Sequence, residues 1–497
     1  MSTHEVVVIG GGFGGIASAL RLRALGHRVT LIERNAHLGG RAQSLQIDGY
    51  KHDTGPTVIT APYLFDELFA LFGERRADHI EFKALDTWYR FIFADGDRFD
   101  YGGTPEQIER EIVRVSAADL SGYRALVAHS KRLYEKAYEQ LGDVPFNRLS
   151  TMIRQVPALA RLRADQSVWQ LVSKHIKSDK LRQAFSIQPL LVGGNPFDTT
   201  SIYTLIHYLE RAHGVYFAMG GTQALVEALH GLLQRAGVEI LTQMTVRKIH
   251  VQQRLVTAIE TVSGDLFKPD SVVFNGDPMH LYDTMIERKA QTTSIRMKHK
   301  SAKLSMGLYV MFFGTKKSYP EVAHHTIWMG SRYKELLDDI FNRKILPEDF
   351  SLYIHRPTAT DPTFAPPGHD SFYVLAPVPH LGSGIDWKEE GPKLQARIIA
   401  ALSQTILPGL QDNIAATHAM TPEDFRSDYL SYQGTGFSLA PIFTQSAWFR
   451  FHNHVEGIEN LYLAGAGTHP GAGLPGVLTS AKVIERLFKD SSIQKAA

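Results

Sequence analysis

A glycine-rich turn near the amino terminus constrains this chain more than any other feature. Gly10, Gly12 and Gly15 follow the apolar run Val6–Ile9 and precede the helical pattern Ile16–Leu25. The first glycine permits a tight turn, the second lets backbone approach a pyrophosphate, and the third lets the helix pack on the strand. The helix N-terminus then presents unpaired N–H groups to phosphate. The sequence therefore predicts a Rossmann-type dinucleotide-binding unit.

An acidic residue ends the second predicted strand, as is typical of a dinucleotide-binding unit. The second predicted strand, Arg28–Ile32, ends at Glu33. A carboxylate at this place accepts hydrogen bonds from the ribose hydroxyls of an adenosine. It also repels a 2′-phosphate, which disfavours NADP but leaves NAD and FAD open.

Further turns suggest additional contacts with the same ligand. Gly39, Gly40 and Arg41 follow directly, and Arg41 could meet the pyrophosphate charge or remain a solvated surface arginine. Asp53–Pro56 is a similar tight turn. Near the carboxyl terminus, the loop 465–476 contains five glycines between a predicted strand and a predicted helix. Its His469 is either catalytic or held beside the ligand by hydrogen bonds.

Composition excludes several classes of protein. Lys plus Arg is 53 and Asp plus Glu is 51, so no strong basic field suggests a nucleic-acid partner. The absence of cysteine excludes disulfides, thiolate metal sites and flavin attachment through sulfur, and we expect no metal. The polar start is not that of a signal peptide. No run of roughly 18 apolar residues predicts a membrane span, although peripheral contact is possible.

The two ends of the chain both carry nucleotide-site elements, which implies one discontinuous domain with the middle inserted into it. We expect an α/β fold: a Rossmann-type cofactor domain, an inserted α+β substrate domain and a helical, membrane-facing region. The expected division is 1–75 plus 215–290 plus 450–497, then 76–214, mainly helical, and 291–449. A length of 497 residues fits two or three units.

One predicted helical segment, 145–180, is both basic and amphipathic. Its apolar residues recur at helical spacing and its flanks are basic, which fits either a helix in the interface of an anionic bilayer or an ordinary core helix. The apolar positions are Leu149, Met152, Ile153, Val156 and Leu159 or Ala160, and the basic ones are Arg148, Arg154, Arg161, Arg163, Lys174, Lys177 and Lys180.

These motifs carry a family resemblance over almost the whole chain. The segment 10–41 resembles the amine-oxidase-like flavoprotein superfamily. Within this superfamily, the bacterial phytoene desaturases are closely resembled by five further segments of the chain. These are 53–60 (DTGPTVIT), 190–196 (LLVGGNP), 201–209 (SIYTLIHYL), 372–381 (FYVLAPVPHL) and 461–477. Two departures are Leu474, where many members have isoleucine, and the pair Ser150–Thr151, where relatives carry a charged pair.

The resemblance implies noncovalent FAD and hydride transfer from 15-cis-phytoene to flavin N5, forming lycopene or neurosporene. It also implies a peripheral enzyme on the inner, cytoplasmic face of the membrane, with quinone or oxygen as electron acceptor. No catalytic residue or proton acceptor is identified. Together, motifs and resemblance give the expected cofactor-binding residues: Gly10, Gly12, Phe13, Gly14, Gly15, Glu33, Arg34, Gly40, Arg41, Gly55, Pro56, Thr57, Val246, Asn275, Gly465, Ala466, Gly476 and Val477.

Other functions remain open. A related enzyme could act on a C30 or hydroxylated carotenoid, or isomerise double bonds. A flavin amine oxidase would act on a soluble amine. A flavin-free binding protein on the same fold, like the dissociation inhibitors of prenylated GTPases, need not retain the glycine motifs and the ribose acid that this chain keeps.

Overall fold

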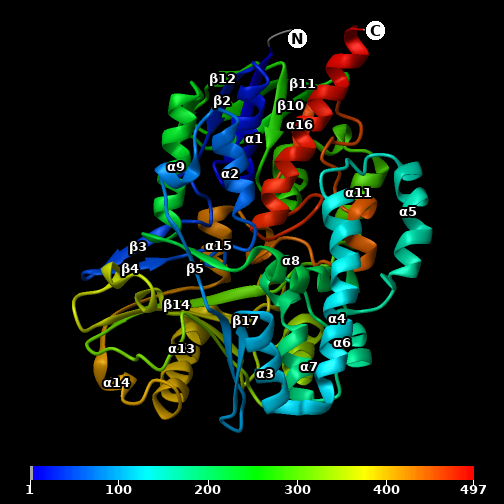
Figure 1. Ribbon diagram of the computed structural model, residues 1–497. Helices are drawn as coiled ribbons and strands as arrows, with labels where there is room; N and C mark the ends of the chain where they lie inside the picture. Colours follow the sequence, from blue (N-terminus) through cyan, green and yellow to red (C-terminus); the bar gives the residue numbers. More distant parts are fainter. Residues whose placement is uncertain (1–3, 497) are drawn as a thin grey trace.

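The computed structural model describes residues 4–496, with side chains described through residue 490. A parallel sheet of five strands forms the end of the molecule where both termini lie (Figure 1). It confirms the strands expected around both glycine-rich loops. The strand order is β19 (Leu461–Leu463), β13 (Ser271–Phe274), β1 (Glu5–Ile9), β2 (Arg28–Ile32) and β9 (Glu239–Leu241).

Helices cover one face of this sheet, and a small antiparallel sheet covers the other. Val6 and Val8 of β1 pack toward the helices, whereas Val7 and Ile9 pack toward the small sheet. This alternation explains the continuous apolar run, because a parallel strand covered on both faces needs apolar residues at every position. The helices are α1 (Phe13–Ala24), α2 (Tyr63–Ala70), α9 (Gly221–Arg235) and α16 (Leu474–Ala496), and the small sheet is β10 (Val246–Gln252), β11 (Leu255–Thr261) and β12 (Leu266–Phe267).

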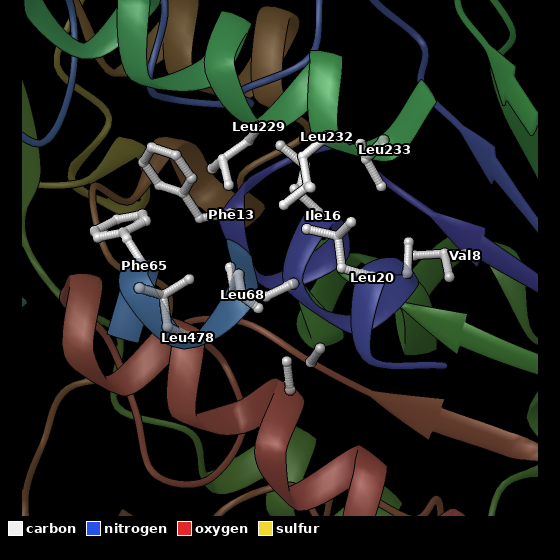
Figure 2. Packing of buried hydrophobic residues seen from close by; sticks show 14 of the residues in the cluster. Val8, Phe13, Ile16, Leu20, Phe65, Leu68, Leu229, Leu232, Leu233 and Leu478 are labelled. Carbon is white, nitrogen blue, oxygen red and sulfur yellow. The ribbon is translucent and has the colours of Figure 1, made fainter. Parts of the chain in front are cut away.

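The core of the helical layer joins segments from both ends of the chain. Figure 2 shows Ile16 and Leu20 of α1 facing the leucines of α9, while Leu478 of α16 approaches Phe65 and its neighbours from α2. Ile16, Leu20 and Phe65 are each 0% exposed. Segments from both ends of the chain thus share one packed core on the helical face of the sheet.

A second sheet of seven strands forms the opposite half of the molecule, where β14 and β17 lie side by side (Figure 1). Two of its strands, β6 and β7, come from the segment that was expected to be mainly helical. The sheet therefore crosses the expected boundary between 76–214 and 291–449. Its order is β18 (Ile414–Met420), β14 (Gly307–Thr315), β17 (Asp370–Val378), β16 (Leu352–His355), β15 (His325–Trp328), β6 (Thr87–Ile92) and β7 (Arg98–Gly102).

Helices of the segment 105–213 lie beside both sheets, with α5 at the outer edge (Figure 1). They are α3 (Pro105–Ser116), α4 (Leu120–Leu133), α5 (Leu149–Arg161), α6 (Val168–His175), α7 (Asp179–Ser186) and α8 (Leu205–His213). Among the described residues, none of the helices combines the length and apolarity that crossing a bilayer requires.

Shorter elements complete the fold. Two strand pairs connect its halves: β3 (Ser44–Ile47) with β4 (Tyr50–Asp53), and β5 (Phe82–Ala84) with β8 (Tyr216–Ala218). The remaining helices are α10 (Pro278–His280), α11 (Thr293–Ser301), α12 (Tyr333–Asp338), α13 (Trp387–Gln404), α14 (Leu410–Asn413) and α15 (Pro422–Tyr429).

The packing predicts a large stability difference between two chemically identical substitutions. Leu20→Ala removes a fully buried side chain and should lower the free energy of unfolding by about 2–5 kcal/mol. Leu266→Ala, where the side chain is 59% exposed, is the matched control and should change it by about 0.5 kcal/mol or less. Equilibrium urea unfolding measures both. Equal losses would contradict the assigned core.

Candidate functional site

A cavity of about 590 Å³ lies at the carboxyl edge of the parallel sheet and extends against the seven-stranded sheet. The structure brings the predicted cofactor residues together there, although they come from four regions of the chain. Seventeen of the eighteen line the cavity, and Gly15 is the exception.

Each glycine of the first turn has a separate steric role. A Cβ at Gly15 would lie 1.9 Å from the carbonyl oxygen of Gly10, so this glycine allows α1 to pack on the turn. A Cβ at Gly14 would lie 2.4 Å from Oδ1 of Asn275. At Gly12, however, the nearest protein atom would be 3.2 Å away, and this residue lines the cavity. The backbone at Gly12 therefore borders the cavity with no side chain in between.

Glu33 is buried beside this turn, at 5% exposure. Its Oε2 accepts a hydrogen bond from the Gly11 N–H at 2.7 Å, and its Oε1 accepts one from the Asn35 N–H at 2.8 Å. Burial raises the pKa of Glu33, while these hydrogen bonds oppose the rise. The carboxylate thus stands at the end of β2, and each oxygen keeps capacity for a ribose hydroxyl.

Two arginines near the cavity differ in environment. Arg41 donates from Nη2 to the Ser431 hydroxyl at 2.6 Å, and its buried Nε has no hydrogen-bond partner among the described residues. Burial lowers the pKa of Arg41, and the Asp277 carboxylate acts in the opposite direction. Arg34 also lines the cavity, but its Nη1 donates to the Ser427 carbonyl at 2.7 Å. The buried Nε of Arg41 is thus a donor that a bound pyrophosphate could use.

The second glycine loop packs against the first turn through β13. Asn275, directly after β13, donates from Nδ2 to the Gly10 carbonyl at 3.2 Å, and a Cβ at Gly465 would lie 2.7 Å from its Oδ1. The loop is supported from behind by Arg450, which is 1% exposed and donates from Nη2 to the Ala466 carbonyl at 2.7 Å. Sequence reasoning missed Arg450, because its partners are backbone carbonyls brought together only by folding.

His469 is held in one orientation. Its Nε2 donates to the Leu141 carbonyl at 3.2 Å, and its ring packs edge-on against Phe146 with centroids 4.8 Å apart. Burial lowers the pKa of His469 to about 4, so the ring is neutral at physiological pH. This environment favours the role of a positioned, neutral histidine over that of a proton carrier.

The cavity also has an extensive apolar wall that the motifs did not reveal. It is built from helices of the segment 105–213 and from the sheet β14–β17–β16. Among its residues are Leu141, Phe146, Met152, Leu159, Ile187, Leu190, Ile202, Leu205, Ile206, Leu209, Met306, Leu308 and Leu375.

The amphipathic helix α5 contributes to this wall from one side only. Met152 and Leu159 are buried and line the cavity. The other apolar residues of the predicted stripe point outward, since Leu149 is 49%, Ile153 59% and Val156 51% exposed. The stripe expected from sequence is therefore divided between the cavity and the molecular surface.

A polar group interrupts the apolar wall. Glu210 of α8 is 0% exposed and lines the cavity, and its Oε1 accepts a hydrogen bond from the Tyr89 hydroxyl at 2.9 Å. Close by, the Tyr353 hydroxyl is hydrogen-bonded to Thr57 Oγ1 at 2.6 Å and to Nδ1 of His325 at 2.7 Å. Nothing in the sequence indicated these residues, except that Glu210 is a charged residue on the apolar side of a helix.

Together these features fit a dinucleotide with a large planar ring. The bare backbone at Gly12, the carboxylate of Glu33 and the free Nε of Arg41 fit ribose and pyrophosphate. The turn Gly55–Thr57 and the second glycine loop line the same cavity as the apolar wall.

A family comparison matches this geometry. The model of the family described as flavin containing amine oxidoreductase matches residues 13–483. The chain belongs to this family. It is a flavin-dependent oxidoreductase, and its cofactor is FAD.

Curated relatives cover nearly the whole chain. A phytoene desaturase (lycopene-forming) of a Paracoccus species is 46% identical over 488 residues, covering 98% of this chain and 97% of the relative. A phytoene desaturase (lycopene-forming) of Pantoea ananas is 44% identical and covers 98% and 99%. A phytoene desaturase (neurosporene-forming) of Rhodobacter capsulatus is 40% identical and covers 98% and 94%.

Solved structures support the fold. An oxidoreductase of Methanosarcina mazei gives a TM-score of 0.68 at 15% identity and covers 97% of this chain and 100% of its own. A cyclohexylamine oxidase of Brevibacterium oxydans gives 0.63 at 14% identity and covers 99% of both chains. They confirm the α/β fold with a parallel, Rossmann-type sheet.

The steric difference between two glycines predicts two distinct outcomes. Gly12→Val should deplete FAD while the protein stays folded, because the new side chain enters the cavity. Gly15→Val should destabilise the protein itself, because its Cβ collides with the Gly10 carbonyl. Flavin absorbance per chain and the thermal midpoint measure the two effects. Full FAD content in folded Gly12→Val protein would contradict the placement of FAD against the backbone at Gly12.

Proposed function

We propose that this chain is an FAD-dependent phytoene desaturase that introduces double bonds into 15-cis-phytoene and forms lycopene. One observation carries the proposal: a predominantly apolar wall continues from the glycine cradle. Such a wall suits a long hydrocarbon and not a soluble amine. The 46% and 44% identical lycopene-forming relatives support lycopene as product, and neurosporene is the alternative.

In this proposal the protein supplies binding and orientation. Glu33 holds the adenosine ribose, Val246 contacts the adenine through backbone, and Arg41 meets the pyrophosphate. Gly55–Thr57 and the loop Gly465–Val477 enclose the flavin. When bound, FAD supplies the hydride acceptor, N5 of its ring. The apolar wall binds the polyene, each Å² of buried carbon surface contributing roughly 25 cal/mol.

We also propose that α5 rests on the membrane that stores the substrate. Exposed Leu149, Ile153 and Val156 suit the acyl boundary of a bilayer, and Met152 on the opposite side already lines the cavity. The same helix region carries three exposed arginines, Arg148, Arg154 and Arg161, and none lies within ion-pair distance of a carboxylate among residues 4–490. Anionic lipid on the inner face of the cell membrane would pair with them.

Electrons leave the reduced enzyme to a quinone or to oxygen in this proposal, since a membrane-resting enzyme meets both. The alternatives, action on a C30 or hydroxylated carotenoid or isomerisation of double bonds, are separated from this activity by their substrates and products.

Product analysis tests the activity. Purified protein with FAD and liposomes loaded with 15-cis-phytoene should yield lycopene, identified by chromatography and its visible spectrum. Parallel reactions with a C30 analogue and with putrescine separate the alternatives. Flavin reduction by the amine without lipid, and none by phytoene, would refute the proposal.

Charge on the outer face of α5 tests the membrane contact. Ile153→Glu with Val156→Glu should weaken binding to anionic liposomes by roughly ten-fold or more, because it replaces interfacial apolar surface with carboxylates. Val113→Glu with Met297→Glu changes exposed residues on α3 and α11 and is the matched control. Cosedimentation measures binding. Equal binding by both double variants would rule out α5 as the contact.

A further inference from the structure

Glu210 is the one carboxylate in the described part of the cavity wall that is fully buried and has an oxygen without a partner. Its Oε1 accepts from Tyr89, but Oε2 has no hydrogen-bond partner among the described residues. An unpartnered buried carboxyl oxygen is costly, so a fold keeps one where it has a use. The sequence placed no function on this residue.

The other acids lining the cavity either have a hydrogen-bond partner on both oxygens or are exposed. Both oxygens of Glu33 accept backbone N–H groups. Asp277 accepts from the Met279 N–H and the Ser438 hydroxyl on one oxygen and from the Tyr432 N–H on the other. Asp428 is exposed near the end of α15.

The buried histidines of this region are poor alternatives as proton acceptors. His469 lines the cavity, but its Nε2 is already bonded to the Leu141 carbonyl. The buried group His324, His325 and His355 lies behind Tyr353 and does not line the cavity. Burial and mutual repulsion hold the pKa of His325 far below its ordinary value.

The surroundings of Glu210 bring its pKa close to neutral pH. Burial raises the pKa of Glu210 to about 7, opposed by the Tyr89 hydrogen bond and the charge of Arg211. Arg211 forms no ion pair with Glu210, because its guanidinium lies over the Trp88 ring at 3.8 Å and donates to the Gly103 carbonyl at 3.1 Å. The remaining titratable neighbours, Tyr101 of β7 and Tyr123 of α4, stay neutral, because burial raises the pKa of each.

Glu210 is also connected to the turn proposed to face the flavin. Tyr89 packs against His325 with ring centroids 5.9 Å apart, and His325 is bonded to Tyr353. The Tyr353 hydroxyl in turn holds Thr57 of the Gly55–Thr57 turn. This chain fixes the carboxyl group of Glu210 relative to that turn.

We propose that Glu210 is the general base of desaturation, with its carboxylate accepting the proton that the hydrocarbon loses. This rests on the proposed function. One carbon loses hydride to the oxidised flavin, and the adjacent carbon loses H⁺ to the carboxylate. The electron pair of the second C–H bond becomes the new π bond. No further oxidant is needed in this step, and the carboxylic acid releases its proton before the next cycle.

Conservative substitutions test the assignment. Glu210→Gln keeps the shape and the hydrogen bond from Tyr89 but cannot take a proton, so the rate of phytoene desaturation should fall by roughly 10²–10⁴-fold at unchanged FAD content. Glu210→Asp should restore part of the rate. Glu335→Gln, on the exposed face of α12, is the matched control and should behave as wild type.

The pH profile supplies a readout that a structural role would not move. The wild-type rate should rise as pH increases through about 7, where Glu210 ionises. The residual rate of Glu210→Gln should lack this limb, and Glu335→Gln should keep it.

Stability of the FAD-free protein gives a readout independent of activity. The folded-state pKa lies above the unfolded value of 4.5, so folding takes up a proton between the two. This contribution is complete below the unfolded pKa and is lost as pH rises through about 7. The urea midpoint of wild type should therefore fall, relative to Glu210→Gln, between pH 5 and pH 8. A constant difference would contradict a titrating Glu210.

The outcomes separate the two proposals. If wild type forms no product from phytoene, the proposed function fails, and the role of Glu210 fails with it. If wild type is active and Glu210→Gln is equally active, only the role of Glu210 fails. Loss of activity together with loss of FAD in Glu210→Gln would mark a structural residue and also overturn the inference.

Discussion

The close approach of backbone at the carboxyl edge of the parallel sheet is the contact on which the rest of the molecule depends. Gly10, Asn275 and Gly465 follow three neighbouring strands and touch one another, although they are hundreds of residues apart in sequence. Only glycine allows two of these segments to meet there. Their contact closes the discontinuous cofactor unit and leaves bare backbone facing the cavity.

The cavity combines two environments that a single ligand could not satisfy. Near the glycine turn it offers a carboxylate and a free guanidinium N–H, which suit ribose and phosphate. Beyond the second glycine loop its wall is mainly apolar, where an uncompensated charge is costly. Glu210 is therefore conspicuous, because the fold buries an ionisable group in this wall and, among the described residues, gives it one hydrogen bond.

Local sequence predicted the elements whose signals are local. The strand–turn–helix unit, Glu33 at the end of β2 and the strands beside the second glycine loop were all found. The hairpin of β6 and β7 was missed, although aromatic residues flank an Asp95–Gly96 turn, a typical hairpin signal. The prediction included this hairpin in a long, mainly helical segment, because its partner strand β15 lies more than 200 residues away.

The sequence by itself determined the glycine turn at 10–15 and the acid Glu33 at the end of the next strand. Their spacing is directly related to the shape and charge of a dinucleotide. It also supplied the amphipathic pattern of α5. Only the tertiary structure decided which side of α5 faces the cavity, that Arg450 supports the second glycine loop, and that Glu210 is buried with a free oxygen. Burial and pKa depend on neighbours from distant segments, and a one-dimensional pattern does not contain those neighbours.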